Sequence, residues 1–291
     1  MKSKLFTGSG VALITPFRND LAIDYDAFGA LIEAQISGGA DALIACGTTG
    51  EPSTLTDDEW AAVVSFTVKQ ARGRVPVIAG TGGNDTADVI RKGRRAFELG
   101  ADGQLCVTPY YNKTSQNGLV AHFNAVADAG SLPVIMYNVP SRTGLSMGLG
   151  AAKQLSLNPR IVGIKEATGD AGFALDLIEA CGDDLPLYSG ADEMTCQLRV
   201  IGGVGCISVL SNAAPESAAV IAKADLETAA REQKRMIRFV RCLFKEVNPI
   251  PIKAAMNALG LCENVLRLPL VPMGEENRAL LLAEMRRVGL L

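Results

Sequence analysis

The fold is decided by the stretch Leu-Gly-Ala-Asp-Gly-Gln-Leu at residues 99–105, which joins the end of a helical pattern to the start of a strand. The same kind of joint occurs as Ser-Gly-Gly-Ala-Asp-Ala-Leu-Ile at residues 37–44 and as Ile-Gly-Gly-Val-Gly-Cys-Ile at residues 201–207. In each joint a glycine can take the left-handed conformation that ends a helix, and an apolar strand follows. A joint repeated in this way predicts alternating helices and strands.

Eight short runs rich in Val, Ile, Ala and Leu recur mostly about 25 to 34 residues apart, which is the size of one strand–helix unit. The expected strands are Val11–Ile14, Ala42–Cys46, Val75–Ala79, Gln104–Val107, Val134–Tyr137, Ile161–Lys165, Leu187–Ser189 and Gly205–Val209. Amphipathic segments between them predict helices, among them Asp57–Arg72, Thr86–Leu99 and Gln116–Ala129. Continuously apolar strands with helical crossovers indicate a parallel α/β sheet, and eight units favour a closed (β/α)8 TIM barrel.

An open sheet that binds a dinucleotide is the alternative architecture. It would need a Gly-x-Gly-x-x-Gly loop after a strand, and the glycines near Gly8 and Gly203 lack the third glycine at the required place. We therefore expect one barrel, formed by residues 1–224.

The remainder of the chain has a helical pattern, with segments at Glu216–Ala224, Leu226–Lys245, Pro251–Leu259 and Glu275–Val288. We expect residues 225–291 to form a C-terminal helical extension that packs on the barrel or on a neighbouring subunit. No linker sets this extension apart as a unit that folds by itself.

The composition excludes several classes of partner. A net charge of −3 without a basic block argues against nucleic acid, and no apolar stretch is long enough to span a membrane or to form a signal peptide. The seven cysteines are an odd number without Cys-x-x-Cys spacing, which predicts free thiols in a reducing cytoplasm. The single histidine, His122, falls in a helical segment, and no ligand cluster is present, so we expect no metal.

Reactive groups in barrels of this kind lie at the carboxyl ends of the strands. Lys165 ends an apolar run, so we expect its amine at the barrel mouth, where burial would lower its pKa and let the neutral amine attack a ketone. Tyr137 ends the adjacent strand and places a phenol able to transfer protons beside that amine. The alternatives are a lysine that merely ends a strand and extends to water, and a buried tyrosine with a satisfied hydroxyl.

Carboxylate-binding groups follow two other strands. Thr48 and Thr49 offer adjacent hydroxyls and backbone N–H groups between glycines, which suits a small carboxylate, although such a turn also occurs without a ligand. Arg142 follows Tyr137 by five residues, and its planar guanidinium suits a second carboxylate.

Four motifs at these strand ends resemble those of the dihydrodipicolinate synthase family, which belongs to a pyruvate aldolase superfamily that includes N-acetylneuraminate lyase. The motifs are Gly47-Thr-Thr-Gly-Glu51, Pro109-Tyr-Tyr-Asn-Lys113, Tyr137-Asn-Val-Pro-Ser-Arg-Thr-Gly144 and Gly163-Ile-Lys-Glu166. The resemblance extends from Gly8 to about Ala258 and includes Asn248-Pro-Ile-Pro-Ile-Lys253. It implies a lyase of the diaminopimelate route to lysine that condenses pyruvate with L-aspartate 4-semialdehyde, with a covalent Schiff base and no separate cofactor.

The resemblance also implies a role for each matching residue. Lys165 would form the Schiff base with pyruvate, and Tyr137, Thr48 and Tyr111 would relay protons. Tyr111 would reach in from a neighbouring subunit of a homotetramer built as a dimer of dimers. The substrate-binding residues would be Thr49 for the pyruvate carboxylate, Arg142 for the semialdehyde carboxylate, and the backbones of Gly190 and Ile207.

Lysine inhibits many bacterial members of this family at a dimer interface. The matching effector residues here are Ser53, Trp60, Asn84, Asp88 and Tyr110, near Pro52 and Asp57. Asp57 and Trp60 replace histidines of some sensitive members, and Asp88 replaces a longer glutamate. Thr114 departs from the family pattern as well, since a proline often follows the Tyr-Tyr-Asn-Lys motif.

Two other functions remain open at the level of sequence. A sibling aldolase acting on a sugar acid, such as N-acetylneuraminate or a 2-keto-3-deoxy acid, would share Lys165 and Tyr137. Arg142 and the pair Thr48 and Tyr111 favour aspartate semialdehyde instead. A catalytically silent barrel is the other alternative, and it would be expected to have lost some of these residues.

Overall fold

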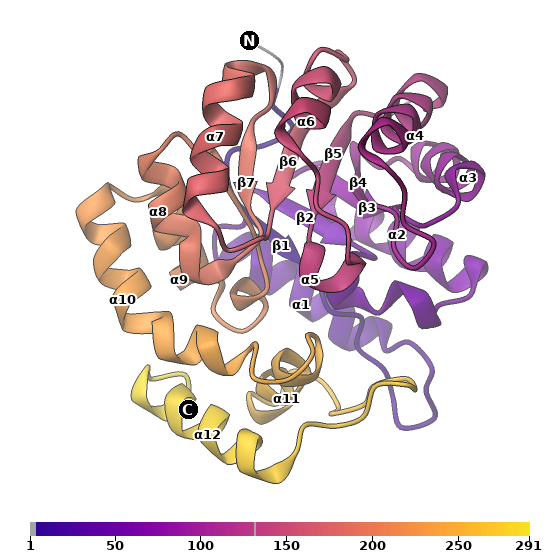
Figure 1. Cartoon of the computed structure of the whole chain (residues 1–291). Coiled ribbons are helices and arrows are strands. Elements are labelled where there is room, and N and C mark those ends of the chain that lie inside the picture. Colours follow the sequence, from indigo (N-terminus) through magenta and orange to yellow (C-terminus); the bar gives the residue numbers. More distant parts are fainter. Residues whose placement is uncertain (1–3, 131) are drawn as a thin grey trace.

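The computed structural model describes residues 4–130 and 132–291, which fold into a closed barrel of parallel strands (Figure 1). Strands pair in chain order and the last pairs with the first, so the predicted TIM barrel is confirmed. The strands are β1 (Gly8–Ala12), β2 (Ala42–Ala45), β3 (Val77–Gly80), β4 (Gly103–Val107), β5 (Val134–Asn138), β6 (Ile161–Glu166), β7 (Leu187–Ser189) and β8 (Gly205–Ser208).

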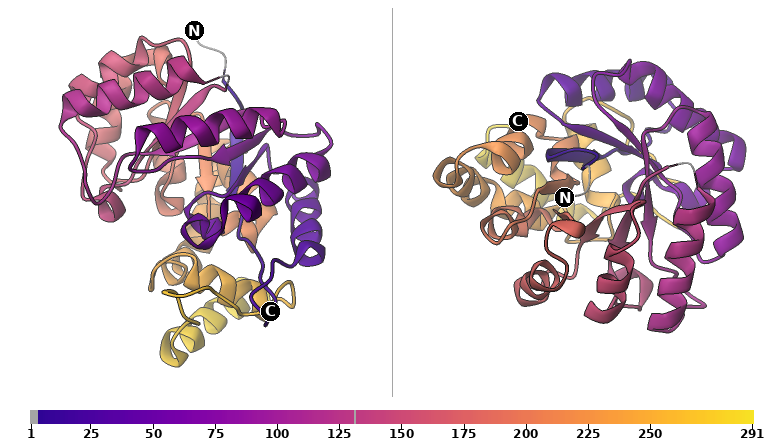
Figure 2. Two further views of the ribbon diagram at one scale, coloured as in Figure 1. Left: turned by 90° about the vertical axis from the view of Figure 1, so that its right-hand side faces the viewer. Right: turned by 90° about the horizontal axis from the view of Figure 1, so that it is seen from above.

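Helices surround the barrel and cover the outer face of its strands (Figure 2). They are α1 (Tyr25–Ser37), α2 (Asp57–Ala71), α3 (Thr86–Glu98), α4 (Gln116–Ala129), α6 (Leu149–Ser156), α7 (Ala171–Cys181), α8 (Thr195–Val200) and α9 (Pro215–Lys223), with the short α5 (Pro140–Thr143) at a strand end. Side-chain oxygens of Asp24, Asp85, Ser115 and Asp170 accept hydrogen bonds from the first turns of α1, α3, α4 and α7. These caps explain why the helices begin where they do.

Two strands start more than one residue away from the predicted position. β1 begins at Gly8 because its glycines pair with β8, Gly8 opposite Gly205, although they carry no apolar side chains to signal a strand. β3 begins at Val77 because Pro76, which precedes it, has no N–H to donate to the sheet. The helix predicted to reach Lys245 ends at Cys242.

Apolar side chains fill the interior of the barrel. Ile44, Ile78, Ile135 and Ile207 belong to this inner cluster together with Tyr188, whose ring stacks on that of Phe6 at 4.5 Å between centroids. The barrel is therefore a packed core, and chemistry is confined to the mouth where the strands end.

The C-terminal segment forms α10 (Leu226–Cys242), α11 (Ile250–Ala258) and α12 (Glu275–Arg287). α10 contacts α8 and α9 of the barrel, and α12 contacts both α10 and α11. In Figure 1 α11 and α12 lie at the end of the molecule opposite the N-terminus, the end toward which β5 and β6 point. The boundary between barrel and extension at residue 224 stays a prediction.

In the part of the chain that the structure describes, no helix is long and apolar enough to cross a membrane.

Candidate active site

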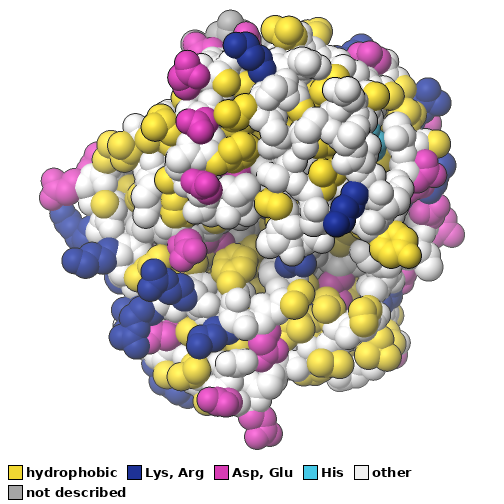
Figure 3. Space-filling view, viewed as in Figure 1, with side chains coloured by type: hydrophobic (Ala, Val, Ile, Leu, Met, Phe, Trp, Pro, Cys, Tyr) yellow, Lys and Arg dark blue, Asp and Glu magenta, His cyan; other side chains and the backbone are white. Residues whose placement is uncertain are grey.

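Lys165 and Tyr137 lie side by side at the mouth of the barrel, because the parallel register of β5 and β6 pairs them directly. Both side chains are buried, Lys165 to 5% exposure, and the Lys165 Nζ lies 4.3 Å from the centroid of the Tyr137 ring. They line a cavity of about 860 Å³ at the carboxyl ends of the strands. Figure 3 shows the surface hollowed between the barrel and the C-terminal helices.

Burial sets the protonation of both groups. The pKa of Lys165 is lowered to about 8, mainly by removal of the amine from water; the carboxylate of Asp192 opposes this shift and the nearby Arg142 adds to it. About a tenth of the amine is then neutral at pH 7, far more than for an exposed lysine. Burial raises the pKa of Tyr137 to about 12, so its phenol keeps a proton that it can donate.

The Thr48 and Thr49 loop follows β2 as the 3-10 turn η1 (Thr48–Gly50). Thr48 lines the cavity and forms a side-chain hydrogen bond with Tyr137, which lowers the pKa of that phenol slightly against the effect of burial. Thr49 is buried, and its Oγ1 accepts a hydrogen bond from Asn248 Nδ2 at 3.0 Å. Two hydroxyls therefore stand on one turn beside the lysine and the phenol.

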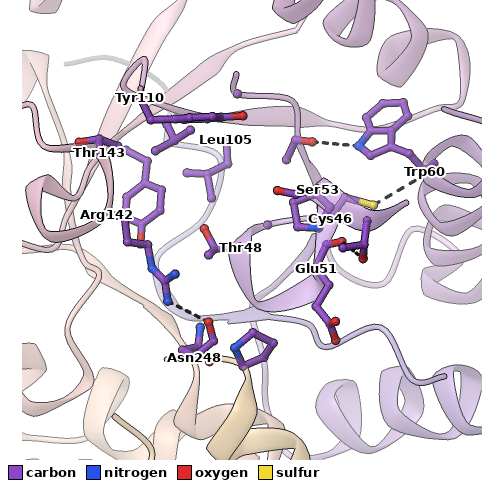
Figure 4. A pocket seen from close by; sticks show the side chains of 18 of the residues that line it. Cys46, Thr48, Glu51, Ser53, Trp60, Leu105, Tyr110, Arg142, Thr143 and Asn248 are labelled. Atoms are coloured by element: carbon purple, nitrogen blue, oxygen red, sulfur yellow. Dashed lines mark hydrogen bonds between the residues drawn. The ribbon is translucent and has the colours of Figure 1, made fainter. Parts of the chain in front are cut away.

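Arg142 reaches the same cavity from α5, which begins at Pro140 and ends at Gly144 in the left-handed conformation. Its Nη2 donates to the backbone oxygen of Asn248 at 2.9 Å, as drawn in Figure 4, which also places Thr48 between Arg142 and Glu51. The guanidinium retains donors for an anionic ligand. A cation thus borders the same cavity as the threonine turn.

Gly190 follows β7 and lines the cavity against the stem of Lys165. A Cβ at this position would come within 3.0 Å of the Lys165 Cγ and Cε and within 2.7 Å of the Ala167 Cβ. Ile207 lies on β8 with its side chain in the inner barrel cluster that contains Tyr137. That the backbones of Gly190 and Ile207 line the pyruvate site stays a prediction.

Tyr111 stands apart from this group. Its side chain is 91% exposed, its backbone is left-handed at φ 64°, and it is not among the residues that line this cavity. A bulky residue held in this conformation is unusual. The prediction that Tyr111 enters the site of a neighbouring subunit stays a prediction.

Two residues of the cavity were missing from the sequence prediction. Asp192 is buried beside Lys165, and its Oδ2 accepts hydrogen bonds from the backbone N–H groups of Val209 and Leu210, both at 3.0 Å. Asn248, which is 6% exposed, comes from the segment between α10 and α11, and its Oδ1 has no hydrogen-bond partner among the described residues. Asp192 follows the end of β7 closely, so the rule of strand ends could have found it.

A second, smaller cavity of about 330 Å³ adjoins the first, and Thr48, Tyr137, Arg142 and Asn248 line both. Its walls include three of the five predicted effector residues, Ser53, Trp60 and Tyr110.

The other two predicted effector residues do not line this cavity. The backbone oxygen of Asn84 accepts a hydrogen bond from Asn112 Nδ2 at 3.0 Å, and Asp88 forms an ion pair with Lys92 at 3.2 Å on α3. The structure therefore brings together Ser53, Trp60 and Tyr110 and leaves Asn84 and Asp88 outside.

His122 lies between helices rather than at the barrel mouth. Its side chain is buried on α4, Nδ1 lies 2.9 Å from Thr86 Oγ1 at the start of α3, and burial lowers its pKa. Among the described residues, no group of three His, Cys, Asp or Glu side chains is placed to hold a metal ion.

Comparisons with known proteins agree on one family. The model of the dihydrodipicolinate synthetase family matches residues 5–287. A 4-hydroxy-tetrahydrodipicolinate synthase of Geobacter sulfurreducens is 46% identical over 291 residues, which cover 99% of this chain and all of the relative. A chloride-inhibited dihydrodipicolinate synthase of Acinetobacter baumannii, solved in complex with pyruvate, superposes with a TM-score of 0.96 at 40% identity, covering 98% and 99% of the two chains. A DHDPS of Cyanidioschyzon merolae, solved with lysine bound, has a TM-score of 0.95 at 36% identity, covering 99% and 100%.

Proposed function

The chain belongs to the dihydrodipicolinate synthetase family, and from this membership we propose that it condenses pyruvate with L-aspartate 4-semialdehyde through a Schiff base on Lys165. The product would be 4-hydroxy-tetrahydrodipicolinate, and the enzyme is a lyase of the diaminopimelate route to lysine. The observation that carries the proposed chemistry is the buried Lys165 amine beside Tyr137, with a pKa lowered to about 8.

The first half of the reaction would activate pyruvate. The neutral Lys165 amine attacks the ketone carbon, and the carbonyl oxygen leaves as water once it has been protonated. Loss of a methyl proton from the resulting imine gives an enamine. Tyr137 and Thr48 would transfer these protons, and a phenol that keeps its proton until about pH 12 is suited to donate it. Tyr111 of a neighbouring subunit would connect this relay to solvent.

The second half would form the carbon–carbon bond. The enamine carbon attacks the aldehyde of the semialdehyde, whose oxygen takes a proton to become the hydroxyl. The substrate's own amine then attacks the imine carbon, closes the ring and releases the Lys165 amine. Thr49 would hold the pyruvate carboxylate and Arg142 the carboxylate of the semialdehyde, because a guanidinium binds a carboxylate through two parallel hydrogen bonds.

Borohydride trapping tests this proposal. Reduction in the presence of pyruvate should give a stable adduct, which mass spectrometry of the digested protein should locate on Lys165. The variant Lys165→Met should give no adduct. An adduct on another lysine, or none at all, would contradict the Schiff-base mechanism and would favour the silent barrel.

Arg142→Ala tests the second substrate. We expect the pyruvate adduct on Lys165 to form as before, while kcat/KM for the semialdehyde falls by about a hundredfold, since a charge-assisted bidentate contact is lost. Steady-state rates at saturating pyruvate measure this. The alternative function, a sugar-acid aldolase, is not favoured by the comparisons. An Arg142→Ala variant that kept its full rate with the semialdehyde would make that alternative a candidate again.

We also propose that lysine binds in the smaller cavity and that the protein assembles as a homotetramer in the cytoplasm. Three predicted effector residues line that cavity, and the Cyanidioschyzon merolae relative was solved with lysine bound. The seven cysteines are an odd number without Cys-x-x-Cys spacing, which supports a reducing compartment. An unchanged rate in millimolar lysine under limiting substrate would exclude inhibition.

A further inference from the structure

Glu51 and Lys253 form a buried ion pair at the barrel mouth that takes no part in the proposed reaction. The Lys253 Nζ lies 2.5 Å from the Glu51 Oε1, and the two side chains are 0% and 1% exposed. The same ammonium donates to the backbone oxygen of Val265 at 2.9 Å and lies 4.0 Å from the centroid of the Phe17 ring. Lys253 comes from α11, so this pair connects the C-terminal extension to the loop after β2.

Arg267 holds the same loop from a second direction. Its backbone N–H donates to the Glu51 Oε2 at 3.2 Å, and its guanidinium donates to the backbone oxygen of Thr54 at 2.8 Å. Two further hydrogen bonds, at 2.8 and 2.6 Å, join that guanidinium to both carboxylate oxygens of Glu59 at the start of α2. Arg267 is thereby fixed in place, and it fixes Glu51 in turn.

Glu51 lies at a point of backbone strain. It separates η1 from the next 3-10 turn, η2 (Pro52–Thr54), and its φ of 54° is in the left-handed region that side chains other than glycine rarely adopt. Such a conformation persists only where its surroundings impose it. The side-chain contacts of Glu51 with Lys253 and Arg267 can hold it in this conformation. They thereby fix the turn that carries Thr48 and Thr49.

A buried ion pair is an inefficient way to stabilise a fold, because the cost of removing both charges from water cancels much of their attraction. Apolar residues of similar size would serve stability as well. The ion pair differs from an apolar pair in that its fixed partners orient the Glu51 carboxylate. In Figure 4 Glu51 and Arg142 lie on opposite sides of Thr48.

We propose that Glu51, held by Lys253 and Arg267, is a positioning residue that sets the place of Thr48 and Thr49 relative to Lys165. The C-terminal extension would then determine how tightly the barrel mouth binds pyruvate. This inference rests on the proposed function, because it assigns the threonine turn to the pyruvate carboxylate.

The test is the double variant Glu51→Gln with Lys253→Met, which removes both charges together and leaves neither buried alone. Borohydride trapping over a range of pyruvate concentrations gives the half-saturating concentration and the maximal adduct on Lys165. We expect the half-saturating concentration to rise about tenfold or more while the maximal adduct at saturating pyruvate is retained, since displacing a binding group weakens uniform binding and leaves the amine in place.

The matched control is Met285→Ala, which removes a fully buried side chain from α12, a helix that contributes nothing to either cavity. It should lower the melting temperature and leave the half-saturating pyruvate concentration unchanged. If the double variant does not fold, the milder variant Arg267→Lys can be used instead. It removes the paired hydrogen bonds between the Arg267 guanidinium and the Glu59 carboxylate, and it should also raise the half-saturating pyruvate concentration.

A half-saturating concentration within twofold of the unsubstituted protein, in whichever of these variants folds, would overturn the positioning role. The same rise in Met285→Ala would also overturn it, because general destabilisation would then explain the effect. An unsubstituted protein that forms no adduct on Lys165 would overturn the proposed function and the inference together.

Discussion

The burial of Lys165 determines the pH at which its amine can react. Its pKa of about 8 means that the neutral fraction grows about tenfold per unit of pH below that value and levels off above it. We therefore expect the rate of Schiff-base formation at limiting pyruvate to rise from pH 6 to pH 8 and then to reach a plateau. Rapid quenching with borohydride across this range measures the rate, and a flat profile would contradict the assignment.

Asp192 should move that profile. Its carboxylate raises the pKa of Lys165 against the effect of burial, so Asp192→Asn should lower the pKa and shift the rising limb toward lower pH. The amide oxygen of asparagine can still accept from Val209 and Leu210, which keeps the turn after β8 in place. A shift toward higher pH would show that Asp192 acts on the lysine by some other route.

Gly190 should be intolerant of even a methyl group. The added Cβ of Gly190→Ala would press on the Lys165 stem and on Ala167, so the amine must move. We expect kcat/KM to fall by about tenfold or more. Gly150→Ala on α6 is the matched control, because no atom lies within 4 Å of its added Cβ, and its rate should stay unchanged.

The residues of the candidate site differ in how well they could be predicted from the sequence. Lys165 and Tyr137 could be predicted because each ends an apolar strand. Asn248 could not be placed in the same way, since its partner Thr49 lies 199 residues away and only the folded extension brings the two together. Asp192 could have been found because it follows a strand end, but its hydrogen bonds with the N–H groups of Val209 and Leu210 form only when the barrel closes.

At the scale of elements, α2 begins at a capping box whose Glu59 also binds Arg267 near the barrel mouth. Thr56 Oγ1 accepts from the Glu59 N–H at 3.2 Å, and the Glu59 carboxylate accepts from the Thr56 N–H at 2.9 Å. We expect Thr56→Ala to lower the free energy of unfolding by about 1 kcal/mol. Thr56→Ser keeps the hydroxyl and should lose little, and equal losses in the two variants would show that the cap is not responsible. Chemical denaturation measures both.

Elements were predictable where their pattern is strong. Gln116–Ala129 agrees with the prediction at both ends, because Ser115 caps it and Gly130 follows it. β1 was misplaced because two of its five residues are glycines, and its pairing with β8 joins opposite ends of the barrel sequence. The Glu51, Lys253 and Arg267 contacts depend on two elements and a connecting loop meeting, so periodicity could not indicate them.

At the scale of the whole molecule, the exposed Tyr111 predicts shared active sites. The variant Lys165→Met should inactivate the site of the subunit that carries it. The variant Tyr111→Phe should inactivate the site of the neighbouring subunit. Co-expression of the two should restore activity, because in half of the dimers one of the two sites pairs an intact lysine with an intact tyrosine. We expect about a quarter of the unsubstituted rate from random pairing. Recovery no greater than the sum of the two variants would place Tyr111 outside the neighbouring site.

The late position of Asn248, Lys253 and Arg267 has a consequence for synthesis on the ribosome. All eight strands have been translated by Ser208, yet the contacts that hold the threonine turn are supplied by residues 248–267. At roughly 5 to 20 residues per second, the 59 residues from Ser208 to Arg267 take about 3 to 12 seconds to translate, and during that time the barrel strands lack these contacts. The pyruvate site would thus be completed only when translation is nearly over, and a prematurely terminated product would carry the reactive lysine without a well-formed substrate site.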